Sequence, residues 1–182
     1  MREEFFNQLL QILGDSIVNI GNEFFNFQVA GNEDPIERER VYCGELYHQI
    51  RNRIEDFPFS INIEPDKKRH PYIENSCGAI DPDLVIHRPG RMSRDDNLAV
   101  IEVKKSTGNL TDGIIKDIRT INCMTTLENG YYGGMIIIFG QLTNLRITNL
   151  IRRIAENKSE EIGKFNLILH NHVNVIPEII EL

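Results

Sequence analysis

Apolar side chains recur at helical spacing near the start of the chain, at Phe5, Leu9 and Leu13. Residues four positions apart lie on one face of a helix, so the pattern predicts a helix over residues 2–27, interrupted near residues 14–16. This segment is rich in phenylalanine. Its apolar face suits packing against the rest of the protein or against a second copy of the chain, and the pattern leaves both interpretations open.

Helical and strand patterns alternate over the rest of the chain. The segment from Asp34 to Glu37 has the features of a helix start, because Asp caps, Pro35 fits the first turn and Glu completes a capping box. Residues 65–75 are polar and predict a loop. The predicted helices cover 34 to about 54, 111 to about 127 and 144–157, and the predicted strands cover 59–63, 80–87, 98–105, 131–139 and 165–170.

This order of elements predicts a mixed sheet. Three strands follow one another without a helix between them, which favours antiparallel pairing, and the later strand–helix–strand crossovers add parallel pairs. We therefore expect an α/β fold with a mixed sheet flanked by helices. It would consist of a helical extension over residues 1–31 and a main domain over residues 32–182.

The composition fits one globular domain, since the 182 residues are 41% hydrophobic and 26% charged. The longest apolar run, Met135–Phe139, is far shorter than the roughly 20 residues of a membrane span, and the acidic N-terminus does not resemble a signal peptide. Cys43, Cys77 and Cys123 form no CxxC pair. These features predict a cytoplasmic protein that has no membrane segment and no disulfide framework.

The net charge is −7, from 20 Lys and Arg against 27 Asp and Glu. This argues against a protein that coats nucleic acid nonspecifically. It allows an enzyme that gathers carboxylates around a metal and keeps its basic residues in one patch. The sequence has no P-loop, GxGxxG or GxSxG motif, so neither a nucleotide cofactor nor a serine hydrolase is expected.

Two segments combine acids and a lysine with apolar strand residues. Asp83 immediately precedes Leu-Val-Ile, and Glu102 and Lys104 lie inside the next predicted strand. Side chains alternate along a strand, so Glu102 and Lys104 point to the same face. Buried charges persist only when they are paired or bound to a metal. Carboxylates suit Mg²⁺, and a lysine can neutralise charge that develops on phosphorus, so the set suits metal-assisted phosphodiester hydrolysis. A buried salt bridge is the alternative.

At these residues the sequence resembles a known superfamily. Pro82-Asp83, with Asp83 nineteen positions before Glu102-Val103-Lys104, is similar to the PD-(D/E)XK motif of restriction-endonuclease-like nucleases. The resemblance covers about residues 34–140 and implies an αβββαβ core. The segments that resemble the third strand, the following helix and the next strand are Asn97–Ser106, Lys116–Met124 and Tyr131–Gly140.

The resemblance also implies roles for these residues. Asp83 and Glu102, with the backbone carbonyl of Val103, would hold Mg²⁺, for which Mn²⁺ would substitute. Lys104 would assist a metal-bound water in attacking a DNA phosphate. Asp81 shares a face with Asp83 and remains an alternative acid.

Members of the superfamily commonly have a glutamate on an upstream helix, for which Glu39 and Glu45 are candidates. Glu39 falls at the centre of the apolar stripe of its predicted helix, in line with Cys43 and Leu46, whereas Glu45 lies off that centre. An acid on a buried face needs a partner, so Glu39 is favoured as a catalytic residue. A solvated or salt-bridged helix residue is the alternative for either glutamate.

Basic residues near the motif are candidate contacts to DNA phosphates: Arg88, Arg91 and Arg94 between the two motif strands, and Lys67 and Lys68 in the preceding loop. A homodimer through the N-terminal helix would allow both strands of a duplex to be cut. The primary hypothesis is a Mg²⁺-dependent (endo)deoxyribonuclease, and the sequence leaves endonuclease and exonuclease action open. The alternatives are a catalytically inactive binding or scaffold subunit with the same fold, or an RNA-directed nuclease.

Overall fold

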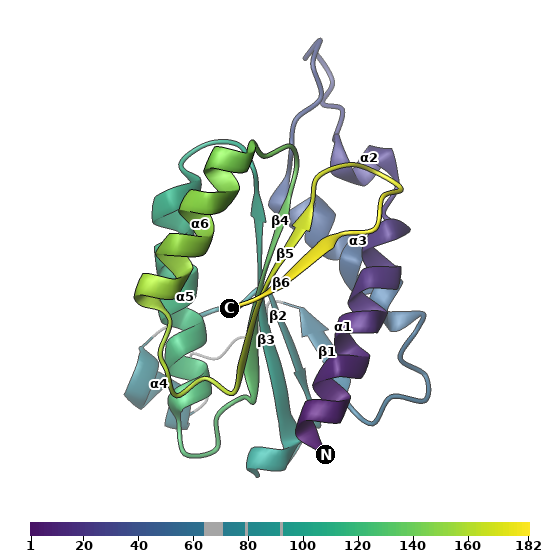
Figure 1. Cartoon of the computed structure of the whole chain (residues 1–182). Helices are drawn as coiled ribbons and strands as arrows, with labels where there is room; N and C mark the ends of the chain where they lie inside the picture. The colour runs from purple at the N-terminus through teal and green to yellow at the C-terminus, as the bar shows by residue number, and fades with distance from the viewer. Residues whose placement is uncertain (64–70, 79, 92) are drawn as a thin grey trace.

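One six-stranded sheet with helices on both faces forms the centre of the computed structural model (Figure 1), which describes residues 1–63, 71–78, 80–91 and 93–182. The spatial order of the strands follows the sequence, β1-β2-β3-β4-β5-β6. The β1–β2, β2–β3 and β5–β6 pairs are antiparallel, whereas β3, β4 and β5 are parallel. The strands are β1 (Ser60–Ile63), β2 (Leu84–His87), β3 (Asn97–Lys105), β4 (Gly133–Phe139), β5 (Lys164–His170) and β6 (Glu178–Glu181). The predicted mixed α/β architecture is confirmed.

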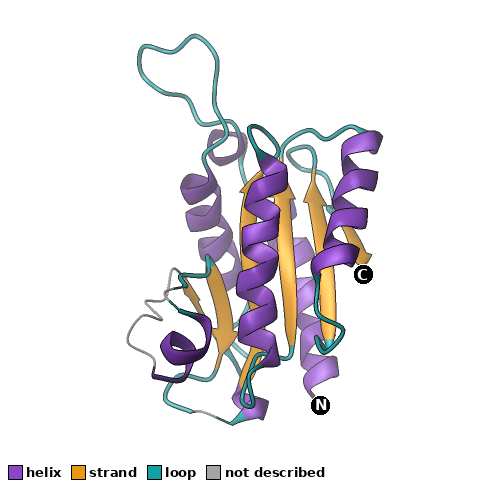
Figure 2. Ribbon diagram, turned by 90° about the vertical axis from the view of Figure 1, so that its left-hand side faces the viewer, coloured by secondary structure: helices purple, strands orange, loops and turns teal. Residues whose placement is uncertain are grey.

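The helices form two layers, one on each face of the sheet, as Figures 1 and 2 show. One layer contains α1 (Arg2–Val18), α2 (Asn22–Phe25) and α3 (Glu39–Arg51). The other contains α4 (Pro71–Cys77), α5 (Leu110–Thr126) and α6 (Asn144–Asn157). The parallel crossovers from β3 to β4 and from β4 to β5 both pass through this second layer, which gives the two successive βαβ units.

The central strands are buried on both faces because a hydrophobic core lies on each side of the sheet. Along β3, Ile101 and Val103 pack in the core shared with α1 and α3, whereas Val100 packs in the core shared with α5 and α6. This alternation places Glu102 and Lys104 on the α5 face of a buried strand. Their charges therefore lie where the surrounding sequence is apolar.

Helix α1 belongs to the core of the domain rather than to a separate extension. Phe6, Leu9, Leu13 and Ile17 are completely buried in the core that contains β3 and α3. The apolar face that suggested a dimer contact is thus covered by the chain itself. A homodimer through that face has no support in this structure.

Three other expectations about elements are corrected. Helix α3 begins at Glu39 instead of near Asp34, because Ile36 forms a β-bridge with Phe27 and holds the preceding segment extended. Part of the predicted polar loop at 65–75 is helix α4, and its residues 65–70 lie outside the described part of the chain. Strand β6 was not predicted; its short sequence has no clear alternation of burial.

The expectation about the cysteines is wrong for one pair. Cys77, at the end of α4, forms a disulfide with Cys123 in α5, while Cys43 is a free buried thiol. The pairing depends on the packing of α4 against α5, which no spacing in the sequence reveals.

No helix in the described part of the chain combines the length and the apolar character needed to cross a bilayer.

Candidate functional site

The pairing of β2 with β3 brings two acids together. Leu84 pairs with Ile101, so Asp83, one residue before β2, lies beside Glu102 and Val103. Oδ2 of Asp83 accepts a hydrogen bond from the backbone N–H of Val103 at 2.7 Å. The carboxyl groups of Asp83 and Glu102 also share a side-chain hydrogen bond. The two predicted metal ligands are therefore in direct contact.

Lys104 lies at the end of β3 between acids from both helix layers. Its Nζ is 3.2 Å from Oδ2 of Asp117 in α5 and 3.9 Å from Oε2 of Glu39 in α3. The other oxygen of Glu39, Oε1, accepts a hydrogen bond from the backbone N–H of Lys105 at 3.1 Å. Glu39 thereby joins the first turn of α3 to the carboxyl end of β3 and contacts the lysine at the end of this strand.

Burial dominates the electrostatics of this cluster. Glu102 is only 4% exposed, and burial, together with the nearby charges of Asp83 and Asp117, raises its pKa well above the ordinary value. Burial also raises the pKa of Asp83, although the Val103 N–H and the Lys104 charge oppose the shift. Both acids are thus held toward their protonated forms, which explains how two carboxyl groups can share a hydrogen bond.

Asp117 and Lys104 influence each other in the same surroundings. Asp117 is 3% exposed, and burial raises its pKa from 3.8 to about 6, against the attraction of Lys104. Burial alone would lower the pKa of Lys104, but the surrounding acids, Asp117 first among them, raise it. The lysine therefore carries its positive charge in the centre of an acidic cluster.

The structure separates the alternatives that the sequence left open. Glu39 reaches Lys104, whereas Glu45, on the same helix, accepts a hydrogen bond from Gln49 at 2.7 Å. Asp83 contacts β3, whereas Asp81 is exposed. The residues that meet are therefore Glu39, Asp83, Glu102 and Lys104, in the combination favoured from the sequence.

Asp117 was missed in the sequence, although a signal was present. It lies between Ile114 and Ile118 on the buried face of α5. An acid on the apolar face of a helix needs a partner. The argument that selected Glu39 on α3 thus selects Asp117 on α5 as well, and the partner in both cases is Lys104.

The arginine-containing connection lies at the other end of these strands. It joins His87 to Asn97, which are neighbours in the β2–β3 ladder, whereas Asp83 lies at the opposite end of β2. At about 3.3 Å per residue, five residues separate Asp83 from Arg88 by about 17 Å. The expectation that this connection lies beside the carboxylates is therefore wrong.

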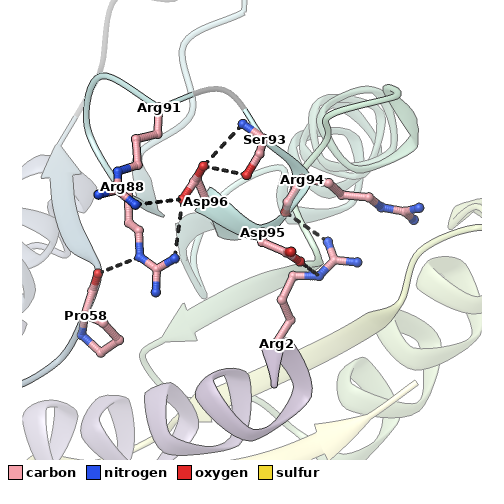
Figure 3. Close-up of polar contacts among 8 residues, drawn as sticks. All are labelled: Arg2, Pro58, Arg88, Arg91, Ser93, Arg94, Asp95 and Asp96. Atoms are coloured by element: carbon pink, nitrogen blue, oxygen red, sulfur yellow. Dashed lines mark hydrogen bonds and ion pairs between the residues drawn. The ribbon is translucent and has the colours of Figure 1, made fainter.

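The arginines of this connection also have local partners (Figure 3). Arg88 donates hydrogen bonds to the carbonyl of Pro58 and to Oδ1 of Asp96, at 3.0 and 3.4 Å. Arg91 lies 3.9 Å from the same carboxylate oxygen. Figure 3 shows the side chain of Arg94 pointing away from this group, while its carbonyl accepts a hydrogen bond from Arg2. Lys67 and Lys68 lie outside the described residues.

The donor set fits a divalent cation only in part. Among the residues that the structure describes, no group of three or more His, Cys, Asp or Glu side chains is arranged to hold a metal. Asp83 and Glu102 supply two adjoining carboxyl groups. Mg²⁺ is usually bound through one or two carboxylates, several waters and the phosphates of the substrate, so two acids agree with that mode of binding.

Comparisons with known proteins identify no family. No family model matches the chain, and no curated protein matches it. Among solved structures, the chain is similar to SfsA from Pyrococcus furiosus, determined in complex with Ca²⁺, at 12% identity. The match covers 86% of this chain and 68% of that protein, with a TM-score of 0.37.

Proposed function

We propose that the protein is a metal-dependent nuclease that hydrolyses DNA phosphodiester bonds. The observation that carries this proposal is the meeting of Asp83, Glu102 and Lys104 at one end of β3, a strand that is apolar from Leu98 to Ile101. The finer fold assignment, a restriction-endonuclease-like core built from α3, β1–β3, α5 and β4, is part of the same proposal. The strand order and the mixture of antiparallel and parallel pairs support it.

The proposed chemistry assigns a role to each side chain. Asp83 and Glu102 would hold Mg²⁺ or Mn²⁺, with the Val103 carbonyl as a third ligand. The bound ion would supply an activated water and stabilise negative charge at the phosphorus. Lys104 would place its ammonium against a phosphate oxygen, where the charge grows during attack. Glu39 and Asp117 would hold that ammonium in position.

The test is a cleavage assay with matched variants. Purified protein is incubated with supercoiled plasmid and with single- and double-stranded oligonucleotides, in Mg²⁺, in Mn²⁺ and in EDTA. We expect cleavage only with a metal, and its loss in Glu102→Gln and in Lys104→Met. Glu45→Gln and Lys164→Met are the controls, because Glu45 contacts Gln49 and Lys164 pairs with Glu181 near the opposite end of the sheet.

Calorimetric titration with Mn²⁺ gives a second measurement. Wild type is expected to bind the ion, and Asp83→Asn and Glu102→Gln to bind it at least tenfold more weakly. A protein that neither binds Mn²⁺ nor cleaves any substrate would contradict the proposal. The cluster would then be a buried ion network in a scaffold protein.

A further inference from the structure

A polar cavity of about 350 Å³ opens beside the candidate site. Its walls come from the residues that follow three parallel strands: Thr107 after β3, Gln141 after β4 and Asn171 after β5. In Figure 1 this is the end of the sheet to which the arrows of β4 and β5 point. In open sheets with parallel strands, ligands commonly bind outside the carboxyl ends of the strands.

One segment of chain forms the wall between the cavity and the acidic cluster. Glu39 contacts Lys104 and Lys105, while Glu37 accepts hydrogen bonds from the backbone N–H and Oγ1 of Thr107 at 3.1 and 2.8 Å. Glu37 also lines the cavity. The cavity therefore begins two residues after Lys104 along the chain, at Ser106, and shares the segment from Glu37 to Glu39 with the acidic cluster.

The lining is unsuited to phosphate and suited to a neutral, hydrogen-bonding group. None of the described residues that line the cavity is a lysine or an arginine, and Glu37 would repel an anion. Amide, hydroxyl and imidazole side chains alternate with apolar surface from Phe25. The carboxylate of Glu37 and the amide of Gln141 are acceptors in this lining. A ligand with N–H groups would be favoured, because these acceptors can receive hydrogen bonds from it.

We infer that this cavity receives the base of the nucleotide next to the phosphate bound at Lys104. The inference rests on the proposed function and narrows its substrate class. A cavity of this size accommodates a base, whose amino and imino groups would meet acceptors such as Gln141 and Glu37. A base can enter such a cavity only when it is unpaired. The preferred substrate is therefore a single strand, an end or a mismatch rather than an intact duplex.

The experiment measures binding without cleavage. Fluorescence anisotropy is recorded with a labelled single-stranded oligonucleotide and the full chain in EDTA. One abasic position is then moved along the oligonucleotide. Removing the base that occupies the cavity should weaken binding about ten- to a hundred-fold at one position, the range found when a base loses its stacking contacts. The same oligonucleotide in duplex form should bind more weakly than the single strand.

Two variants and a control assign the effect to the cavity. Gln141→Ala and Asn171→Leu should each reduce the difference between intact and abasic strands. Gln11→Ala, which removes an exposed amide from α1 far along the chain, should leave that difference unchanged.

The outcomes separate this inference from the proposed function. Metal-dependent cleavage together with an abasic scan that shows no sensitive position overturns the base cavity alone. A sensitive position without any cleavage in Mg²⁺ or Mn²⁺ supports the cavity and contradicts the nuclease. No binding of any strand overturns the inference.

Discussion

Replacing Asp117 with Asn tests whether the acidic cluster is held together at the expense of stability. Asp117 is 3% exposed, and its Oδ2 lies 3.2 Å from Nζ of Lys104. Asn has nearly the same size and shape as Asp. Any change in the free energy of unfolding would therefore arise from the charge, and not from a cavity or a clash.

The magnitude follows from the pKa of Asp117, which burial raises from 3.8 to about 6. Because the pKa is higher in the folded state, the folded state is favoured below pH 3.8, and this advantage is lost as the pH rises to about 6. At about 1.4 kcal/mol per unit, the ionised carboxylate destabilises the fold by about 3 kcal/mol above pH 6. Asp117→Asn should therefore be about 3 kcal/mol more stable than wild type at pH 7.5, and only about 1 kcal/mol more stable at pH 4.5.

Urea denaturation at pH 4.5, 6.0 and 7.5 in EDTA measures this difference. Asp56→Asn, which changes an exposed carboxylate, is the control and should shift stability by less than about 0.5 kcal/mol at each pH. In the cleavage assay, Asp117→Asn should lose activity, because Lys104 loses its nearest acid. A variant less stable than wild type at pH 7.5, or a difference that does not change with pH, would refute the reasoning.

Three further predictions concern stability. Burial lowers the pKa of His170 from 6.5 to about 4, so protonation of this residue should contribute a loss of up to about 3 kcal/mol in the free energy of unfolding as the pH falls from 6.5 to 4. Thermal denaturation across this range should show that the difference between wild type and His170→Gln changes by this amount. Gly134→Ala should lower the free energy of unfolding, measured by urea denaturation, by about 1–3 kcal/mol, because the new methyl group overlaps Ile121 of α5. An unchanged urea midpoint would contradict the close packing of α5 on β4. Cys77→Ser should lower the free energy of unfolding by about 2–4 kcal/mol, because Cys77 and Cys123 close a loop of 46 residues. Dithiothreitol should lower the free energy of unfolding of wild type by the same amount and leave that of the variant unchanged.

The parts of the fold set by local pattern could be predicted from the sequence. The apolar residues on both sides of β3 required a central strand, and the alternation within it placed Glu102 and Lys104 on one face. The wheel position of Glu39 required an inward-facing acid, and the structure places it against Lys104. These conclusions depend only on the period of a strand or a helix.

The parts set by contacts between distant segments could not be read in the same way. The capping signals at Asp34 are real but are overridden, because Ile36 bridges to Phe27 and Glu37 binds Thr107. The arginine-containing connection was misplaced for another reason. A connection between antiparallel neighbours must lie at the end of the ladder where the first strand stops, which is opposite to Asp83. The predicted antiparallel pairing of these two strands therefore already implied that the arginine-containing connection lies at the end of the ladder away from Asp83.

The balance of charge in the cluster bears on its purpose. Glu39, Asp83, Glu102 and Asp117 surround a single lysine, so four carboxylates and one ammonium would leave a net charge of −3 if all were ionised. One acid would suffice to neutralise Lys104, and each further buried carboxylate adds a desolvation penalty without a partner. Burial raises the pKa values of Asp83, Glu102 and Asp117, so the ionisation of all these acids together is disfavoured. A divalent cation would relieve this excess of negative charge, which is why we interpret the cluster as a cation site rather than as a structural salt bridge.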